Sequence, residues 1–369
     1  QDVLGEFLNA DREAYIFSPI DAEDESREQQ RADRQTPMTP SQAARTKTAA
    51  RRRPIRDHYS KDSYNRAVML REALEAILDQ PFRYVVVVDN CSSDETPEVL
   101  ASFDDARLQV VRLDRNTGGA GGFHVGCAVA AELDVDWVVL QDDDARPVPD
   151  FMERLTDAVA GLPDEVGGLA AAVRSPDGVI VEMNRPSVSP FRDRRDILSA
   201  VLHGRAALHI EDSAYEADYD TDVDCVAFVG YVMRRDLIGG ELGLPRKEFF
   251  IYADDQSYSY RVRELGYRNV FKPELKYIHD CATYDNTRAV SPRWKVYYLY
   301  RNSLEFYRQI AGRFFYPVVP FKLVAWTVRA QRYPRGERVA YLKIAGRGVL
   351  DGLRRRFDVP HDDVVDFSS

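Results

Sequence analysis

Three consecutive carboxylates, Asp142, Asp143 and Asp144, are the residues of this chain best suited to bind a metal ion. They follow an apolar run that ends at Leu140, and adjacent carboxylates repel one another unless a cation lies among them. Hard divalent cations prefer such oxygen ligands. Because alternate residues of an extended segment point the same way, we expect Asp142 and Asp144 to share one cation while Asp143 faces elsewhere. The alternative is a solvated acidic turn.

Two further polar or glycine-rich segments follow apolar runs. Asp89 comes directly after the run 84–88, and the glycine-rich segment 116–122 follows a run that ends near Leu113. Glycines let the backbone approach a ligand closely, and the N–H groups that open a helix favour phosphate. The spacing matches neither the dinucleotide-binding fingerprint nor a Walker motif. The alternatives are a flexible turn for the glycines and, for the Asp89 segment, a helix cap in addition to contacts with a base or ribose.

The elements that must position these residues alternate between helices and strands. Apolar residues at helical spacing precede the first strand-like run, and two more such runs are separated by helical patterns. The runs are 84–88, 108–113 and 137–140, and the helical patterns are 70–78, 94–103 and 122–133. This alternation predicts an α/β fold with a mainly parallel, doubly wound sheet. Ligands of such sheets lie beyond the carboxyl ends of the strands, so the three loops share one edge.

Composition places the chain among ordinary globular proteins. Of its 369 residues 44% are hydrophobic and 30% are charged, which argues against fibrous and wholly disordered classes and predicts one large domain with appendages. The four cysteines are scattered without a C-x-x-C pair, so we expect them to be reduced and intracellular. We find neither an apolar stretch of the roughly 20 residues that span a bilayer nor a signal-peptide pattern, and we expect a cytoplasmic location.

The C-terminal part is basic although the net charge of the chain is −10. Residues 288–356 hold sixteen Lys or Arg against three acids, and residues 314–326 are rich in aromatic and aliphatic side chains. This pattern suits an anionic membrane surface, so we expect peripheral contact with the inner face of the cell membrane. The basic residues show no nucleic-acid-binding motif, which argues against a nucleic-acid partner. The alternative is a helical pair packed on the main domain, with a solvated basic face.

The N-terminal residues differ in character from the rest. Residues 1–56 combine an acidic half with a half rich in Thr, Pro, Ala and Arg, and they show little apolar periodicity. We therefore predict that they are mostly disordered. The predicted domain covers 57–290, and 291–369 form a helical, basic extension.

Several motifs occur together in an order that resembles family 2 glycosyltransferases with a GT-A fold, a Rossmann-like α/β arrangement. They are Ser63-Tyr64-Asn65-Arg66, Asp89-Asn90 with residues 92–96, residues 116–119, the three aspartates, residues 249–255 and residues 258–267. The resemblance covers about residues 63–310. Within the family, residues 118–123, the three aspartates and Tyr298-Leu299-Tyr300-Arg301-Asn302 are most similar to bacterial galactofuranosyltransferases, with rhamnosyltransferases close by.

The resemblance implies a nucleotide-sugar site, a metal site and an acceptor site. His279 would join Asp142 and Asp144 around Mn²⁺ or Mg²⁺, although a histidine that follows an apolar residue is, taken alone, more often structural. Tyr231 would contact the acceptor. Asp89 would contact the uracil of a UDP-sugar. The residues expected to bind the nucleotide sugar are Arg66, Asp89, Asn116, Gly118, Gly119 and Asp143.

The resemblance also implies the chemistry of an inverting enzyme. Asp255 would accept the proton of an acceptor hydroxyl, which attacks the anomeric carbon from the face opposite the departing UDP. A bound cation neutralises the charge of a leaving diphosphate. The adjacent Asp254 is part of the same catalytic pair, and like charges raise one another's pKa. Asp254 is equally suited to be the N-cap of the helix that follows.

The expected function is transfer of a sugar, with galactofuranose from UDP-galactofuranose as the first choice, to a glycan or polyprenyl-linked glycan of the cell envelope. One departure concerns the strand that family members carry directly before Tyr-Asn-Arg, because residues 55–62 have little strand character. Either that strand comes from elsewhere or the nucleotide site is damaged. The alternatives are a rhamnosyltransferase, a catalytically impaired nucleotide-sugar-binding protein, and a nucleotidyltransferase, whose early glycine-rich loop with Arg and Lys is not found in residues 1–66.

Overall fold

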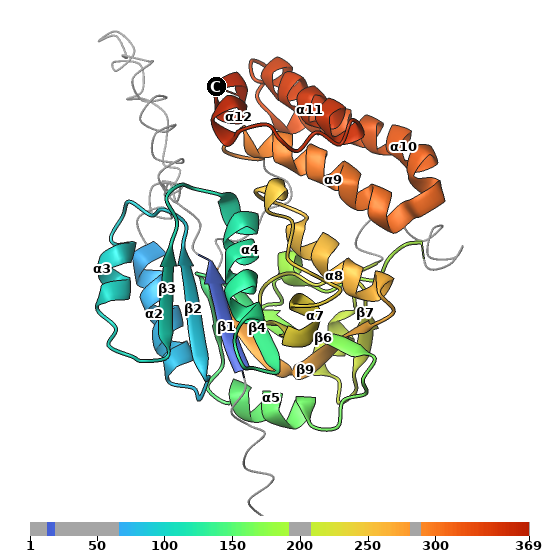
Figure 1. Ribbon diagram of the computed structural model, residues 1–369. Helices are drawn as coiled ribbons and strands as arrows, with labels where there is room; N and C mark the ends of the chain where they lie inside the picture. The colour runs from blue at the N-terminus through green and yellow to red at the C-terminus, as the bar shows by residue number, and fades with distance from the viewer. Residues whose placement is uncertain (1–12, 19–65, 192–207, 281–288, 369) are drawn as a thin grey trace, which may run out of the picture.

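The computed structural model describes residues 13–18, 66–191, 208–280 and 289–368, and Figure 1 shows their arrangement. The described strands form one mixed sheet in the order β3-β2-β1-β4-β8-β6-β9-β5, with β7 paired to β9. The expected α/β class is confirmed. The strands are β1 (Glu13–Ser18), β2 (Tyr84–Asp89), β3 (Leu108–Arg112), β4 (Trp137–Asp142), β5 (Ala145–Pro147), β6 (Val166–Arg174), β7 (Thr221–Val223), β8 (Tyr231–Arg234) and β9 (Arg268–His279).

The sheet begins with four parallel strands. β1 pairs in parallel with β2 and β4, and β2 pairs in parallel with β3. The carboxyl ends of β2 and β4 therefore lie at one edge of the sheet. β2 is a nearly continuous run of buried valines, as is usual for a parallel strand with both faces covered. This half of the sheet agrees with the predicted doubly wound arrangement.

The strand that the sequence lacks directly before Arg66 is supplied by β1, which lies between β2 and β4. It pairs with β2 over residues 14–17 and with β4 over residues 13–18. The prediction of disorder is therefore wrong for these six residues, which form a central strand. The only local signal is the short apolar run of residues 14–17, and the two partner strands lie far along the chain. Residues 1–12 and 19–65 lie outside the described residues.

The other half of the sheet departs from the predicted, mainly parallel arrangement. β8 runs antiparallel to β4 and β6, and β5 and β7 run antiparallel to β9. Only the pair β6 and β9 is parallel among these described strands. The alternation of helices and strands from which the parallel arrangement was predicted ends at β4, because β5 follows β4, and β8 follows β7, without a helix that could form the crossover of a parallel pair.

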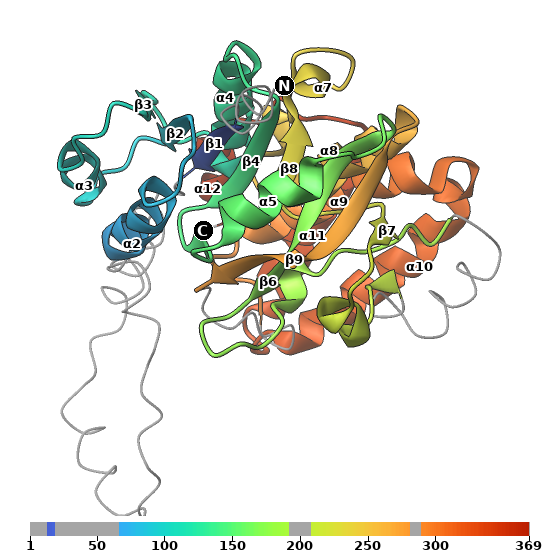
Figure 2. The same cartoon turned by 90° about the horizontal axis from the view of Figure 1, so that it is seen from below.

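Helices cover both faces of the sheet and form two apolar cores. One core contains α2 (Arg66–Leu78), α3 (Thr96–Ala101) and α5 (Phe151–Val159), and the other contains α4 (Gly118–Ala131), α7 (Arg235–Ile238) and α8 (Asp254–Glu264). Figure 1 shows α4 on the near face and α2 behind the strands, and in Figure 2 α5 crosses in front of them. The predicted helices before β2, β3 and β4 are confirmed. α4 begins at Gly118, so the glycines form its first turn.

The described residues after 290 are mainly helical, as predicted. α9 (Lys295–Ala311), α10 (Phe315–Val328), α11 (Arg338–Leu353) and α12 (His361–Ser368) lie together at one end of the molecule in Figure 1. They enclose a third core that is rich in aromatic side chains, and α9 packs against both α11 and α8. Among the helices in the described ranges, none combines the length and the apolar character needed to span a bilayer.

Candidate functional site

The topology of the sheet brings the aspartate triplet next to His279. β4 ends at Asp142, and the turn that follows leads into β5, whose first residue Ala145 pairs with His279 at the end of β9. The backbone N–H of Asp280 donates to the carbonyl of Asp144 at 2.9 Å and fixes this turn against β9. Residues that are 135 positions apart in the chain therefore share one end of the sheet.

The side chains of Asp142, Asp144 and His279 converge on one point. One ligand atom from each lies within 4.8 Å of the other two, and His279 Nε2 is 2.9 Å from Asp144 Oδ1. The side chains of Asp142 and Asp144 are partly exposed, whereas Asp143 is buried. This is the arrangement expected when alternate residues of the triplet face the same way.

The electrostatics of this cluster favour a cation. Although Asp142 is partly exposed as a residue, its carboxyl group is largely surrounded by protein, and this desolvation, together with the negative charge of Asp144, raises the pKa of Asp142 to about 8, whereas His279 opposes the shift. The carboxylates of Asp143 and Asp255 add to the repulsion. A divalent cation would remove the repulsion, and two carboxylates with one imidazole are a donor set that Mn²⁺ accepts.

A buried asparagine orients the imidazole for that role. Asn184 belongs to the 3-10 helix η2 (Glu182–Asn184), and its Oδ1 lies 2.7 Å from His279 Nδ1. Since an amide oxygen only accepts hydrogen bonds, Nδ1 must carry the proton. Nε2, the other ring nitrogen, then faces the two carboxylates. A partner of this kind fixes the tautomer of metal-binding histidines, so Asp142, Asp144 and His279 fit a divalent cation.

The second acidic pair lies close to the first cluster. The charges of Asp254 and Asp255 both act on Asp142. Asp254 is buried, and burial together with the negative charge of Asp255 raises its pKa well above the usual range. Asp255 is partly exposed and accepts a hydrogen bond from the backbone N–H of Gln256 at 2.6 Å. Asp255 is thus the more accessible carboxylate for an acceptor hydroxyl.

The interpretation of Asp254 as a helix cap is wrong. The N-cap of α8 is Ala253, whose backbone is left-handed with φ 63°, and Asp254 is the first helical residue. A non-glycine residue in this conformation makes a sharp turn into the helix. The turn places both carboxylates in the first helical turn of α8.

The glycine-rich segment is tied to the end of β2 by a buried side chain, that of Asn90. Its amide nitrogen donates to Asn116 Oδ1 at 3.2 Å and to the Gly118 carbonyl at 3.1 Å. Its oxygen accepts hydrogen bonds from the backbone N–H and the hydroxyl of Thr117, both at 2.9 Å. Asn116 in turn accepts from Gly118 N–H. These bonds fix the first turn of α4, where Gly119 also lies, next to the end of β2.

Of two residues expected to contact the nucleotide, the structure describes the side chain of Asp89 but not that of Arg66. The buried carboxylate of Asp89 accepts a hydrogen bond from Ser92 N–H at 2.8 Å and pairs with Arg112 at 3.0 Å. It therefore stabilises the turn after β2, and its contact with a base stays a prediction. Arg66 is the first residue of α2, and its side chain lies outside the described ones.

The expected acceptor residue, Tyr231, lies in the core. Its side chain is fully buried between the sheet and α8, and its hydroxyl donates to Asn269 Oδ1 at 2.7 Å. Burial raises the pKa of this hydroxyl well above its ordinary value. The structure gives Tyr231 a packing role, because one face of β8 points into the apolar core, and the acceptor assignment is not supported.

Sequence reasoning missed the asparagines of this site. Asn90 stands in a motif that indicated the family, but no role was assigned to it. Asn184 gave no signal at all, because it lies in a short 3-10 helix 95 residues before its partner His279. Only the tertiary arrangement pairs the two residues.

Comparisons with known proteins place part of this chain in a described family. Residues 62–205 match the glycosyl transferase family 2 model. The succinoglycan biosynthesis protein ExoO of Rhizobium meliloti is 36% identical over 95 residues, which make up 25% of this chain and 26% of that protein. The galactofuranosyltransferase GlfT1 of Mycolicibacterium smegmatis is 25% identical over 253 residues, or 65% of this chain and 79% of the relative.

A third relative transfers a different sugar. An N-acetylglucosaminyl-diphospho-decaprenol L-rhamnosyltransferase of Mycobacterium tuberculosis is 25% identical over 207 residues, which make up 53% of this chain and 66% of that protein. The matched region thus spans about a quarter of ExoO and larger parts of the other two relatives.

Proposed function

We propose that this chain, whose residues 62–205 match the glycosyl transferase family 2 model, is a metal-dependent, inverting glycosyltransferase. The observation that supports this most directly is the cluster of Asp142, Asp144 and His279 beside the carboxylates of Asp254 and Asp255. One group of side chains suits the diphosphate of a donor, and the other suits the hydroxyl of an acceptor.

The residues divide the reaction between them. Asp142, Asp144 and His279 would hold Mn²⁺ or Mg²⁺, which supplies positive charge for the leaving diphosphate. In the first turn of α4, the N–H groups of Gly118 and Ala120 donate to Asn116 and Phe250, so the N–H of Gly119 would be the one to face the negative charge of the nucleotide. Asp255 accepts the proton of the acceptor hydroxyl as its oxygen attacks the anomeric carbon. Because attack and departure occur on opposite faces of the sugar, the configuration inverts.

Our first choice of donor is UDP-galactofuranose. The relative that transfers galactofuranose matches 65% of this chain, and the rhamnosyltransferase matches 53% at the same identity. A rhamnosyl donor is therefore the second candidate.

A donor screen tests this choice. Purified protein with Mn²⁺ is incubated with UDP-galactofuranose, dTDP-rhamnose, UDP-glucose or UDP-galactose, and the released nucleotide is measured by chromatography. We expect the highest turnover with UDP-galactofuranose, and the Asp255→Asn variant serves as the inactive control. Preferred use of dTDP-rhamnose would overturn the donor assignment, and turnover of nucleoside triphosphates alone would overturn the reaction class.

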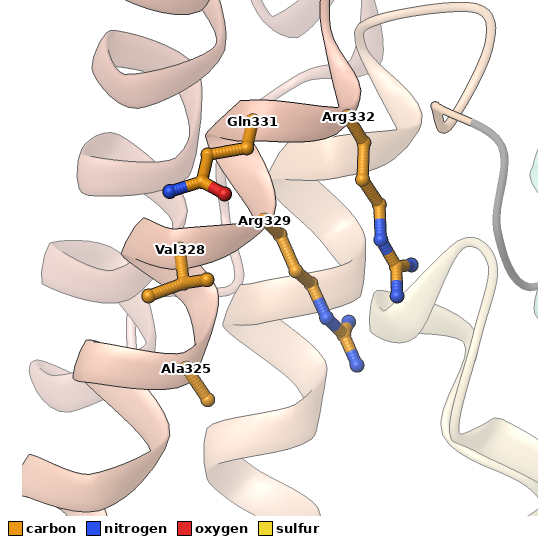
Figure 3. Close-up of a pocket in the computed structure, with 5 residues that line it drawn as sticks. All are labelled: Ala325, Val328, Arg329, Gln331 and Arg332. Carbon is orange, nitrogen blue, oxygen red and sulfur yellow. The ribbon is translucent and has the colours of Figure 1, made fainter.

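The acceptor is proposed to be a polyprenyl-linked glycan, reached at the inner face of the cell membrane. α10 exposes an apolar surface in which Tyr316, Phe321 and Val324 are 76%, 78% and 65% exposed. Near its end, Arg329 and Arg332 extend in the same direction beside a hollow of about 460 Å³ (Figure 3). Aromatic residues beside basic ones suit the boundary between anionic headgroups and acyl chains, where each cation adds about 1 kcal/mol of attraction.

Vesicle co-sedimentation tests this contact on the full chain. We expect binding to vesicles with an anionic lipid, weaker binding to neutral ones, and a decrease as salt rises. Phe321→Ser and Arg329→Gln should each weaken it. Val179→Ser is the control, because Val179 is also exposed, at 61%, but follows β6 on another part of the molecule. Equal recovery of all three variants, or equal binding to both kinds of vesicle, would leave α10 as a helix that only braces the domain.

A further inference from the structure

The loop that leads into the catalytic pair has an unusual backbone. Phe250, Tyr252 and Ala253 have positive φ angles of 64°, 70° and 63°, which non-glycine residues rarely adopt. Asp254 and Asp255 follow directly. Such conformations persist only where the surrounding structure imposes them, and they gather at functional sites. The position of the two carboxylates thus depends on whatever holds this loop, which we call the turn 250–253.

The amide of Asn302 in α9 is the main contact of this turn. It is fully buried, and its Nδ2 lies 2.8 Å from the carbonyl of Phe249, 2.7 Å from that of Ile251 and 3.0 Å from that of Tyr252. The orientation of the amide is settled by its oxygen, which accepts a hydrogen bond from Arg301 Nε at 2.9 Å. A guanidinium only donates, so the NH₂ group must face the carbonyls.

The neighbouring Arg301 holds the start of the same segment. Its side chain is buried, and Nη2 donates to the carbonyls of Glu248 at 2.6 Å and of Phe249 at 3.2 Å. The guanidinium lies over the rings of Tyr298 and Phe357, at 4.8 Å and 5.0 Å from their centroids. Burial lowers the pKa of Arg301 from its usual value. The carbonyls and the aromatic faces take the place of the water that would otherwise surround the guanidinium.

The other side of the turn contacts the glycine-rich segment 116–122 and α12. The carbonyl of Phe250 accepts a hydrogen bond from Ala120 N–H at 3.1 Å. The ring of Phe250 stacks on those of His361, at 4.1 Å, and Tyr298, at 4.9 Å. The turn is therefore held between the first turn of α4 and the C-terminal helices, which makes α9 part of the apparatus that orients the carboxylates.

We propose that Asn302, supported by Arg301, is a positioning residue that sets the turn 250–253 and thereby aims Asp255 at the acceptor hydroxyl. The proposal rests on the proposed function, in which Asp255 is the base. Within the described residues, the hydrogen bonds of the Asn302 side chain go to backbone carbonyls and to Arg301, so it would act on the reaction through the turn and not by contact with substrate. A shift of about 1 Å in a catalytic group costs on the order of 10²-fold in rate.

The test compares Asn302→Ala and Asn302→Ser with a control on the same helix. Tyr300→Phe removes the buried hydrogen bond between Tyr300 and Tyr341 without contact to the turn. We expect kcat to fall about 10- to 100-fold in Asn302→Ala and less in Asn302→Ser, which keeps one donor. In both Asn302 variants the affinity for UDP with Mn²⁺ should stay within about twofold of that of the unmodified protein, because the donor site is intact. Tyr300→Phe should keep the kcat of the unmodified protein.

A double variant separates positioning from general stability. In an Asp255→Asn background, Asn302→Ala should lower kcat little further, because the group that it positions is already gone. Multiplicative losses would overturn the proposal. So would loss of folding in both Asn302 variants, or parallel losses of kcat and UDP affinity that Tyr300→Phe reproduces. If instead Asp255→Asn alone keeps full turnover, the assignment of the base fails, and the proposed function is what must be revised.

Discussion

Replacing Gly118 by alanine perturbs the contact between the glycine-rich segment 116–122 and the turn 250–253. Gly118 has φ +68°, and a Cβ at this position would lie 2.1 Å from the carbonyl oxygen of Phe250 and 2.8 Å from its Cγ. The same carbonyl accepts the hydrogen bond from Ala120 N–H. A single methyl group would therefore push apart the segment expected to bind the diphosphate and the segment that carries the catalytic pair.

The size of the effect follows from this geometry. Cβ atoms essentially never come closer than 3.0 Å to such an atom, so the two segments must separate by about 0.9 Å. The atom nearest to the added Cβ is the backbone oxygen of Phe250, so rotation of a side chain cannot relieve the clash. A displacement near 1 Å costs on the order of 10²-fold in kcat/KM. The left-handed conformation adds about 1–2 kcal/mol of lost stability, because alanine disfavours it.

A matched control separates the clash from the backbone strain. Gly243 has the same φ of +68°, but a Cβ there would meet nothing within 4 Å. We expect Gly118→Ala and Gly243→Ala to share the loss from backbone strain in urea unfolding, while only Gly118→Ala loses about 10²-fold in kcat/KM with the preferred donor. UDP affinity, measured by titration calorimetry, should also fall only in Gly118→Ala. Equal catalytic losses in the two variants would refute the argument.

Three further outcomes are expected at the two acidic clusters. Asp144→Ala should abolish the dependence of UDP binding on Mn²⁺, so that calorimetry with and without chelator gives one affinity. Asp255→Asn should lower kcat by about 10²-fold or more and Asp254→Asn by less, and the opposite order would make Asp254 the base. Asn184→Ala should weaken Mn²⁺ binding about 10- to 100-fold when free Mn²⁺ is followed by paramagnetic resonance, and unchanged binding would show that His279 needs no such partner.

The parts of the fold that were predictable are those with a local signal. The valines of β2 and the helical spacing of α2 follow from burial on both faces of one strand and on one face of one helix. Alternation along an extended chain predicted that Asp142 and Asp144 share a side, whereas in the structure the turn formed by Asp143 and Asp144 brings the two side chains together. For His279, the resemblance to the family was needed, since a single histidine carries no spacing to interpret.

The parts that were missed depend on partners far along the chain. β1 is a strand because β2 and β4 offer it edges on both sides, and its apolar run, residues 14–17, is too short to identify a strand without these partners. Tyr231 was assigned to the acceptor, but β8 is buried on both faces, so neither side of the strand offers this side chain to a ligand.

The asparagines were hidden for a different reason, which also explains why they matter. Asn302 bonds mainly to backbone groups, Asn90 to both backbone and side-chain groups, and Asn184 to the nitrogen of a ring, so none of them produces a charge pattern or a hydrophobic period. A buried amide left without partners is costly, which makes such a residue useful only where its partners have one fixed position. Asn90 and Asn302 hold irregular backbone, and Asn184 holds the ring of His279. These three buried asparagines therefore fix the geometry around the two acidic clusters that we propose to be catalytic.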